Sequence, residues 1–201
     1  MKAITGVVNY GVAGNIHSIS RAIEAAGGNA KVINTIEEFN QVDRLVIPGV
    51  ASFKDAMNEL VKHDFITAIK TSLMEKPVLG ICIGMQILTT LGFEHGVTDG
   101  LNVIEGEVRR MEVNAPLPHV GLNSIEVIAQ NDLLVGLEKK EFYFMHSYEM
   151  VGCDCAVAMT TYGDHRLVSA VNRDNIFGVQ FHPEKSREAG IGLFKNFLKV
   201  S

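Results

Sequence analysis

Several classes of protein need features that this sequence lacks. Its 201 residues include only three cysteines, too few for the disulfide framework of a small secreted protein. Its 23 acidic residues outnumber its 18 basic ones, so the chain lacks the excess positive charge that is typical of nucleic-acid-binding proteins. No apolar run is long enough to cross a bilayer, and no signal peptide is recognisable at the N-terminus. We therefore expect a soluble cytoplasmic protein with no nucleic-acid or membrane partner.

Two of the cysteines, Cys153 and Cys155, form a C-x-C pair. A zinc site would need a second pair of ligands, and none accompanies them. We interpret them as packed or half-exposed thiols and expect neither a metal nor a cofactor.

The first half of the chain alternates apolar runs with helical patterns. We expect strands over 4–8, 30–33, 44–48 and 78–81, and helices over 16–26, 53–74 (in two pieces) and 85–91. Strands separated by helices imply right-handed crossovers and a parallel sheet covered on both faces.

The second half has short strand candidates joined by polar turns. They lie at 103–104, 108, 125–128, 142–146, 156–160, 167–171 and 176–181, and a last helix is expected over 191–200. We expect these strands to extend the same sheet in antiparallel or mixed fashion. The predicted fold is one α/β domain over 1–201, with a mixed, mostly parallel sheet flanked by helices.

The most informative motif surrounds Cys82, in the run Gly80-Ile81-Cys82-Ile83-Gly84. The pattern G-x-C-x-G is the thiol version of a nucleophile elbow, in which glycines allow a tight strand-to-helix turn and the nucleophile is held in a strained pose. The alternative is a buried structural cysteine at the end of a strand.

A second motif places His182 and Glu184 two residues apart after another predicted strand. His182 could take a proton from Cys82 and return it to a leaving amine, and Glu184 could hold the ring in one tautomer from the same face of an extended segment. Taken alone, H-P-E could be a surface turn in which Pro183 ends the strand.

An acyl-transfer site also needs two backbone donors for the oxyanion. The N–H of Ile83 is one candidate, and the loop Gly49-Val50 could provide the other, although this loop could equally be an ordinary turn after a strand. Together the motifs indicate acyl transfer through a thioester.

The elbow, extended to Met85-Gln86, and the run 178–184 (Gly-Val-Gln-Phe-His-Pro-Glu) resemble the class I (triad) glutamine amidotransferases. Within that family the chain is similar to the glutaminase subunit of imidazole glycerol phosphate synthase. This narrower resemblance rests on the segments 9–15, 47–50, 117–123, 143–148 and 185–186.

The resemblance implies that Cys82 attacks the side-chain amide of glutamine, that His182 is base and then acid, and that Glu184 orients it. Ammonia would pass to a separate (βα)₈-barrel subunit that makes imidazole glycerol phosphate and AICAR in histidine biosynthesis. The implied glutamine-binding residues are Gly49, Gly84, Gln86, His146, Ser147 and Tyr148. The implied residues of the partner interface and ammonia gate are Leu122, Asn123, Tyr143 and Lys185.

Three departures from the family pattern bear on the partner and the acceptor. The N-terminal turn has one residue more than usual, with Asn9 where aspartate is common. Ala51 replaces the second glycine of P-G-V-G, and Leu122 replaces a tryptophan, a residue type that the chain lacks altogether. Two alternatives stay open here: the same chemistry serving amidation of a surface-polysaccharide sugar, and a non-catalytic regulatory module that keeps the fold.

Overall fold

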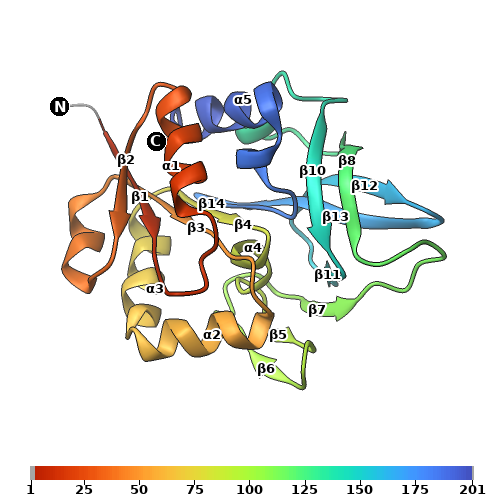
Figure 1. The fold of residues 1–201 in the computed structure, drawn as a ribbon, viewed down its shortest axis with the longest axis horizontal. Coiled ribbons are helices and arrows are strands. Elements are labelled where there is room, and N and C mark those ends of the chain that lie inside the picture. The colour runs from red at the N-terminus through yellow and green to blue at the C-terminus, as the bar shows by residue number, and fades with distance from the viewer. Residues whose placement is uncertain (1–2, 201) are drawn as a thin grey trace.

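The fold is built around one eight-stranded sheet, as seen in a computed structural model that describes residues 3–200 (Figure 1). The strand order is β2-β1-β3-β4-β14-β13-β12-β9. Five of these strands are parallel: β1 (Ile4–Val8), β2 (Asn29–Ile33), β3 (Arg44–Ile47), β4 (Val78–Ile81) and β14 (Ile176–Val179). Three run antiparallel to their neighbours: β13 (His165–Arg173), β12 (Ala156–Tyr162) and β9 (Glu126–Val127). The mixed, mostly parallel sheet with an antiparallel extension is thus confirmed.

Four helices cover the parallel half of this sheet. Helices α1 (Ile16–Ala25) and α5 (Arg187–Phe197) pack together on one side, and α2 (Phe53–Lys62) and α3 (Phe65–Glu75) lie on the other (Figure 1). Two of these helices begin after a polar cap: Asn15 accepts a bond from Ser18 N–H before α1, and Ser52 accepts one from Asp55 N–H before α2. The helical segment over 53–74 is in two pieces, as predicted.

Two smaller sheets pack against the antiparallel half. One pairs β8 (His119–Ser124) with β10 (Glu141–His146), and the other has the order β11 (Tyr148–Val151), β7 (Glu107–Arg110), β5 (Leu91–Gly92), β6 (Thr98–Asp99). The expectation that all strands of the second half join the central sheet was therefore wrong for these. Strands β5, β6, β8 and β11 had not been expected at all.

The helix predicted over 85–91 and the strand at 103–104 were also wrong, for one shared reason. Helix α4 spans only Ile83–Gln86. The carbonyl of Leu88 accepts bonds from the N–H groups of Val103 and Ile104, and the carbonyl of Ile87 accepts one from Leu101. These carbonyl oxygens are engaged by a distant segment, so the helix ends and residues 103–104 bond to it instead of to a strand.

Three loops begin side by side at one edge of the sheet. Strands β3, β4 and β14 are neighbours and parallel, so their carboxyl ends lie side by side. Gly49, Cys82 and Gln180 come one to two residues after these ends. The edge is where the predicted site residues gather.

Helix α4 approaches β3 so closely that only glycine fits at position 84. A Cβ on Gly84 would lie 1.8 Å from the carbonyl oxygen of Ile47, which is backbone and cannot swing aside. Gly84 therefore has a packing role, with the start of the elbow helix seated directly on the end of β3.

We expect Gly84→Ala to destabilise the protein by at least about 2 kcal/mol, because β3 and α4 would have to move apart. Gly192→Ala is the matched control. Gly192 lies in α5, where the added methyl meets only the flexible end of Leu137, and the gain in helix propensity is worth up to about 1 kcal/mol. Urea unfolding of both variants tests this. Equal midpoints for Gly84→Ala and the unaltered protein would contradict it.

Candidate functional site

Cys82 sits at a strained turn between β4 and α4. Its backbone has φ 54° and ψ −110°, a conformation that side-chain-bearing residues rarely adopt. Its N–H donates to the carbonyl of Val179 in β14 at 2.8 Å, and its own carbonyl accepts from Met85 and Gln86. Gly80 allows the turn, since a Cβ there would lie 2.5 Å from the carbonyl oxygen of Gly84. The local geometry is that of a nucleophile elbow.

His182 and Glu184 form a buried pair beside the elbow. His182 Nδ1 lies 2.9 Å from Glu184 Oε1, and the two side chains are 1% and 3% exposed. The segment between them is not extended, as had been expected, but forms a 3₁₀ turn over Pro183–Lys185. This turn brings the carboxylate back onto the ring two residues earlier. Ser186 Oγ donates to the carbonyl of His182 at 2.6 Å and holds the turn closed.

The electrostatics of this pair favour the protonated imidazolium form of His182. Burial would lower the pKa of His182, but Cys82 and Glu184 outweigh it and raise that pKa to about 10. Within residues 3–200, His182 Nε2 is buried and has no hydrogen-bond partner, so it is free toward the Cys82 side. A protonated histidine in this position can give its proton to a leaving group.

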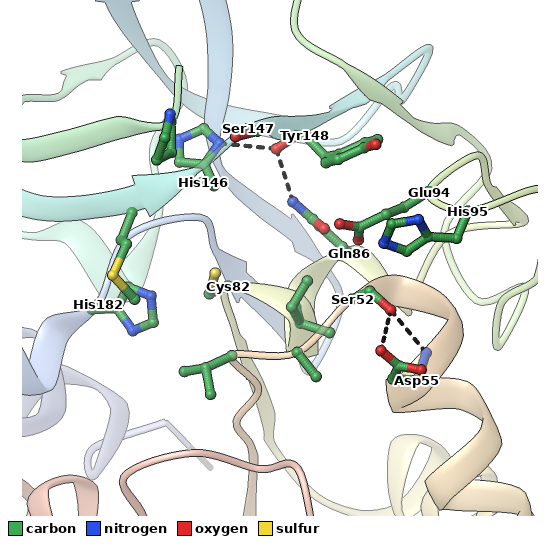
Figure 2. A pocket seen from close by; sticks show the side chains of 15 residues that line it. Ser52, Asp55, Cys82, Gln86, Glu94, His95, His146, Ser147, Tyr148 and His182 are labelled. Carbon is green, nitrogen blue, oxygen red and sulfur yellow. Dashed lines mark hydrogen bonds between the residues drawn. The ribbon is translucent and has the colours of Figure 1, made fainter. Parts of the chain in front are cut away.

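Cys82 and His182 share the wall of a cavity of about 500 Å³ (Figure 2). Other sequence-predicted residues on this wall are Val50, Ile83, Gln86, His146, Ser147 and Tyr148. Gly49 and Gly84, expected to bind glutamine, do not line it. A Cβ on Gly49 would lie 2.7 Å from the Tyr10 hydroxyl and 2.8 Å from Ile83 Cβ, so both glycines lie in closely packed positions, and their role in binding glutamine stays a prediction. The roles assigned to the lining residues stay predictions.

Four residues that were not predicted lie at the other end of the cavity: Ser52, Asp55, Glu94 and His95 (Figure 2). Glu94 Oε2 accepts a bond from Phe53 N–H at 2.9 Å, which fixes its carboxylate at the start of α2. Glu94 lies in the short connection between β5 and β6 and belongs to no motif, so no signal in the sequence could have found it. Its carboxylate and that of Asp55 give this end negative charge.

A carbonyl group organises the wall opposite the elbow. The Tyr148 carbonyl accepts from His146 Nδ1 at 2.8 Å and from Gln86 Nε2 at 3.0 Å (Figure 2). Because a carbonyl can only accept, His146 carries its proton on Nδ1. Burial lowers the pKa of His146 to about 4, so the ring is neutral at pH 7.

The predicted interface residues gather on the outer face of the β8–β10 sheet, except for one. Tyr143 lies opposite Leu122 in the register, and Lys185 Nζ is 5.5 Å from the centre of the Tyr143 ring. Asn123 points to the other face, where its Nδ2 donates to the carbonyl of Thr161 at 2.9 Å. The outer face is apolar and open, with Leu122 43% exposed, and Met145 links it to the cavity.

The comparisons with known proteins identify the family. The sequence profile described as "Glutamine amidotransferase class-I" matches residues 7–200. The chain belongs to the class-I glutamine amidotransferase family. The predictions of the family and of a glutamine amidotransferase are thus confirmed.

Relatives and solved structures agree with this placement. "Imidazole glycerol phosphate synthase subunit HisH 1" of Campylobacter jejuni strain RM1221 is 39% identical over 193 residues, covering 94% of this amidotransferase and 96% of the relative. The protein named subunit HisH of Aquifex aeolicus is also 39% identical, covering 97% and 96%. The fold matches that of PurLQS from Thermotoga maritima with a TM-score of 0.76 at 19% identity, covering 98% of each chain.

Two further observations concern residues 3–200 of the amidotransferase. No helix there is both long and apolar enough to span a membrane. Nor do three or more histidine, cysteine, aspartate or glutamate side chains gather there as ligands for a metal ion.

A second buried histidine, His119, packs against the ring of His146. Its ring stacks on Tyr162 with centroids 4.0 Å apart and on Phe144 at 4.7 Å, and it meets the edge of His146 at 5.3 Å. Burial lowers the pKa of His119 to about 4, so this ring too is neutral in the folded protein at pH 7.

These depressed pKa values predict a loss of stability in mild acid. Between about pH 6.5 and pH 4 the unfolded chain binds protons on both histidines while the folded chain does not, so the free energy of unfolding falls as pH falls. His119→Phe keeps the aromatic stack and removes one such proton. Its loss of stability with pH should be shallower, by at most about 1.4 kcal/mol per pH unit.

Urea unfolding at pH 7, 6 and 5 measures this slope, with the exposed His17→Phe as the matched control. The stability of the control should fall with pH at the same slope as that of the unaltered protein. Parallel behaviour of His119→Phe as well would show that His119 is not kept neutral by the fold.

Proposed function

We propose that this chain hydrolyses glutamine to glutamate and ammonia through a Cys82 thioester. It would pass the ammonia to a (βα)₈-barrel synthase subunit that makes imidazole glycerol phosphate and AICAR in histidine biosynthesis. The observation that carries the chemistry is the strained Cys82 elbow sharing one cavity with a histidine held by a buried carboxylate. The names of the relatives support the pathway, and favour it over amidation of a surface sugar. A biosynthetic role of this kind fits a cytoplasmic protein.

The proposed reaction has two halves. The Cys82 thiolate attacks the side-chain carbonyl carbon of glutamine, and the His182 imidazolium gives its proton to the leaving nitrogen, which departs as ammonia. His182, now neutral, takes a proton from water, whose oxygen attacks the thioester and releases glutamate. Glu184 keeps the ring oriented in both halves.

The substrate fits the cavity by charge and by hydrogen bonding. The α-ammonium group of glutamine would lie toward Glu94 and Asp55, the negatively charged end of the cavity. The oxyanion formed at the side-chain carbonyl needs two N–H donors. Ile83 is the first residue of α4, so its N–H has no acceptor within the helix, and Val50 would supply the second donor.

The first test is covalent capture. A diazo-ketone analogue of glutamine should label Cys82, and Cys82→Ser should abolish both labelling and glutamate release because the nucleophile is lost. The matched control is Cys153→Ser with Cys155→Ser, which removes the two thiols outside the cavity and should leave both intact. Label on Cys153 or Cys155, with activity retained in Cys82→Ser, would reject the proposal.

A partner subunit would dock on the outer face of β8–β10. This face carries Leu122, Tyr143 and, 53% exposed, Val120, and it adjoins the cavity through Met145. The loop of Val50 is also open, with the side chain 48% exposed and packed on Gly14. A partner that contacts this edge could favour the loop conformation in which the Val50 N–H points at the oxyanion.

We therefore expect glutamate release to be slow for the isolated chain and faster in complex with the barrel subunit, and fastest with an acceptor analogue. Supplying one oxyanion donor is worth about a hundredfold in rate. Leu122→Glu should reduce the stimulation without altering the isolated chain. The control is Val135→Glu, at an apolar position that is 59% exposed away from this face. Equal rates in all three states would refute partner dependence.

A further inference from the structure

Gln180 is a buried side chain to which the mechanism above gives no role. It lies two residues before His182, just beyond the end of β14, and is 0% exposed. A buried amide is stable only if its donors and acceptor are used. Its Nε2 lies 3.6 Å from Cys82 Sγ and donates toward it, and its Oε1 accepts from Gln86 Nε2 at 2.8 Å.

The direction of these hydrogen bonds follows from one backbone carbonyl. The Tyr148 carbonyl can only accept, so Gln86 must turn its NH₂ group toward it. The same NH₂ group then donates to Gln180, which must present its oxygen. The NH₂ group of Gln180 is left facing the sulfur of Cys82. Gln86 therefore donates both to the Tyr148 carbonyl and to Gln180, and Gln180 in turn donates toward Cys82.

A donor held against sulfur stabilises the thiolate more than the thiol, because hydrogen bonds to a charged acceptor are the stronger ones. From the geometry we propose that Gln180 is a further catalytic residue, which stabilises the Cys82 thiolate by donating a hydrogen bond to its sulfur. This inference rests on the proposed role of Cys82 as the nucleophile. Gln180 would act beside His182, because its amide is a neutral donor to the sulfur while His182 carries the proton that the leaving nitrogen receives.

The other ionisable groups around the sulfur have different tasks. His182 faces Cys82 and is paired with Glu184, and His146 lies near His182 as a neutral ring. The Tyr10 hydroxyl donates to the carbonyl of Pro48, and burial together with Cys82 raises the pKa of Tyr10, so it stays protonated. Within the described residues, the Gln180 amide is the neutral side-chain donor recorded on Cys82 Sγ.

Two substitutions separate this role from simple packing. Gln180→Glu has the same shape and still accepts from Gln86, but it cannot donate to the sulfur and adds negative charge. Gln180→Met is similar in volume and removes both hydrogen bonds. Gln130, exposed in a loop, takes the same two substitutions as the matched controls.

The measurement is the rate of alkylation of Cys82 by iodoacetamide as a function of pH, resolved by mass spectrometry of the peptide that contains Cys82. The midpoint of the profile should rise by about one pH unit in Gln180→Met and by more in Gln180→Glu. Below both midpoints alkylation should slow about tenfold, and at high pH the rates should converge. The Gln130 variants should match the unaltered protein.

An unchanged midpoint, or a slower rate at every pH, would overturn the inference and leave Gln180 a packing residue. If the Gln180 variants do not fold, nuclear magnetic resonance of the ¹⁵N-labelled unaltered protein decides. The side-chain amide protons of Gln180 should shift with the alkylation midpoint, and they should not do so in Cys82→Ser. Amide signals that do not shift as Cys82 titrates would also refute the role proposed for Gln180.

These outcomes are distinguishable from failure of the proposed function. Iodoacetamide needs no glutamine pocket, so the profile reports on the sulfur alone. Glutaminase activity retained in Cys82→Ser would reject the proposed function. An essential Cys82 with an unmoved midpoint would reject only the role of Gln180.

Discussion

The site depends on the strained backbone at Cys82. A residue with a side chain at φ 54° and ψ −110° is unfavourable, and it persists only where neighbouring contacts fix it. Here α4 is seated on the Ile47 carbonyl through Gly84, and the Cys82 N–H is bound to β14. Three adjacent parallel strands therefore hold one turn from three directions. The rigidity of the sheet is what aims the thiol into the cavity.

The parallel core could be read from the sequence because local patterns decide it. Buried apolar runs such as Val78–Ile81, closed by glycine turns and separated by amphipathic helices, leave few arrangements other than a parallel sheet. The catalytic candidates followed because Cys82 and His182 come just after such strands. Their placement needed no knowledge of distant contacts.

The elements that the sequence did not predict form through contacts between segments that are distant in the chain. Strand β8 contains His119, Gly121 and Asn123, which carry no strand preference, and it forms because β10 lies beside it and aromatic rings enclose His119. In strand β11, Glu149 is buried and its Oε2 lies 2.8 Å from His165 Nε2, a pair that no local sequence pattern predicts. Glu94 reaches the cavity only because β5 joins a separate sheet next to α2. Such residues can be identified only once the folded structure is known.

The arrangement also indicates where control over the reaction can reside. His182 and Glu184 are almost fully buried and already paired, and the Cys82 backbone is fixed by the sheet, so neither part can respond much to a partner. The Val50 loop differs, since its side chain is half exposed and rests on Gly14 in the turn before α1. Under the proposed function, a nucleophile that is prepared in advance, combined with an oxyanion donor on the exposed Val50 loop, would confine regulation to transition-state stabilisation. If the chain passes ammonia to an acceptor as proposed, control at this step would prevent premature release of ammonia, because no thioester would form until both donors are in place.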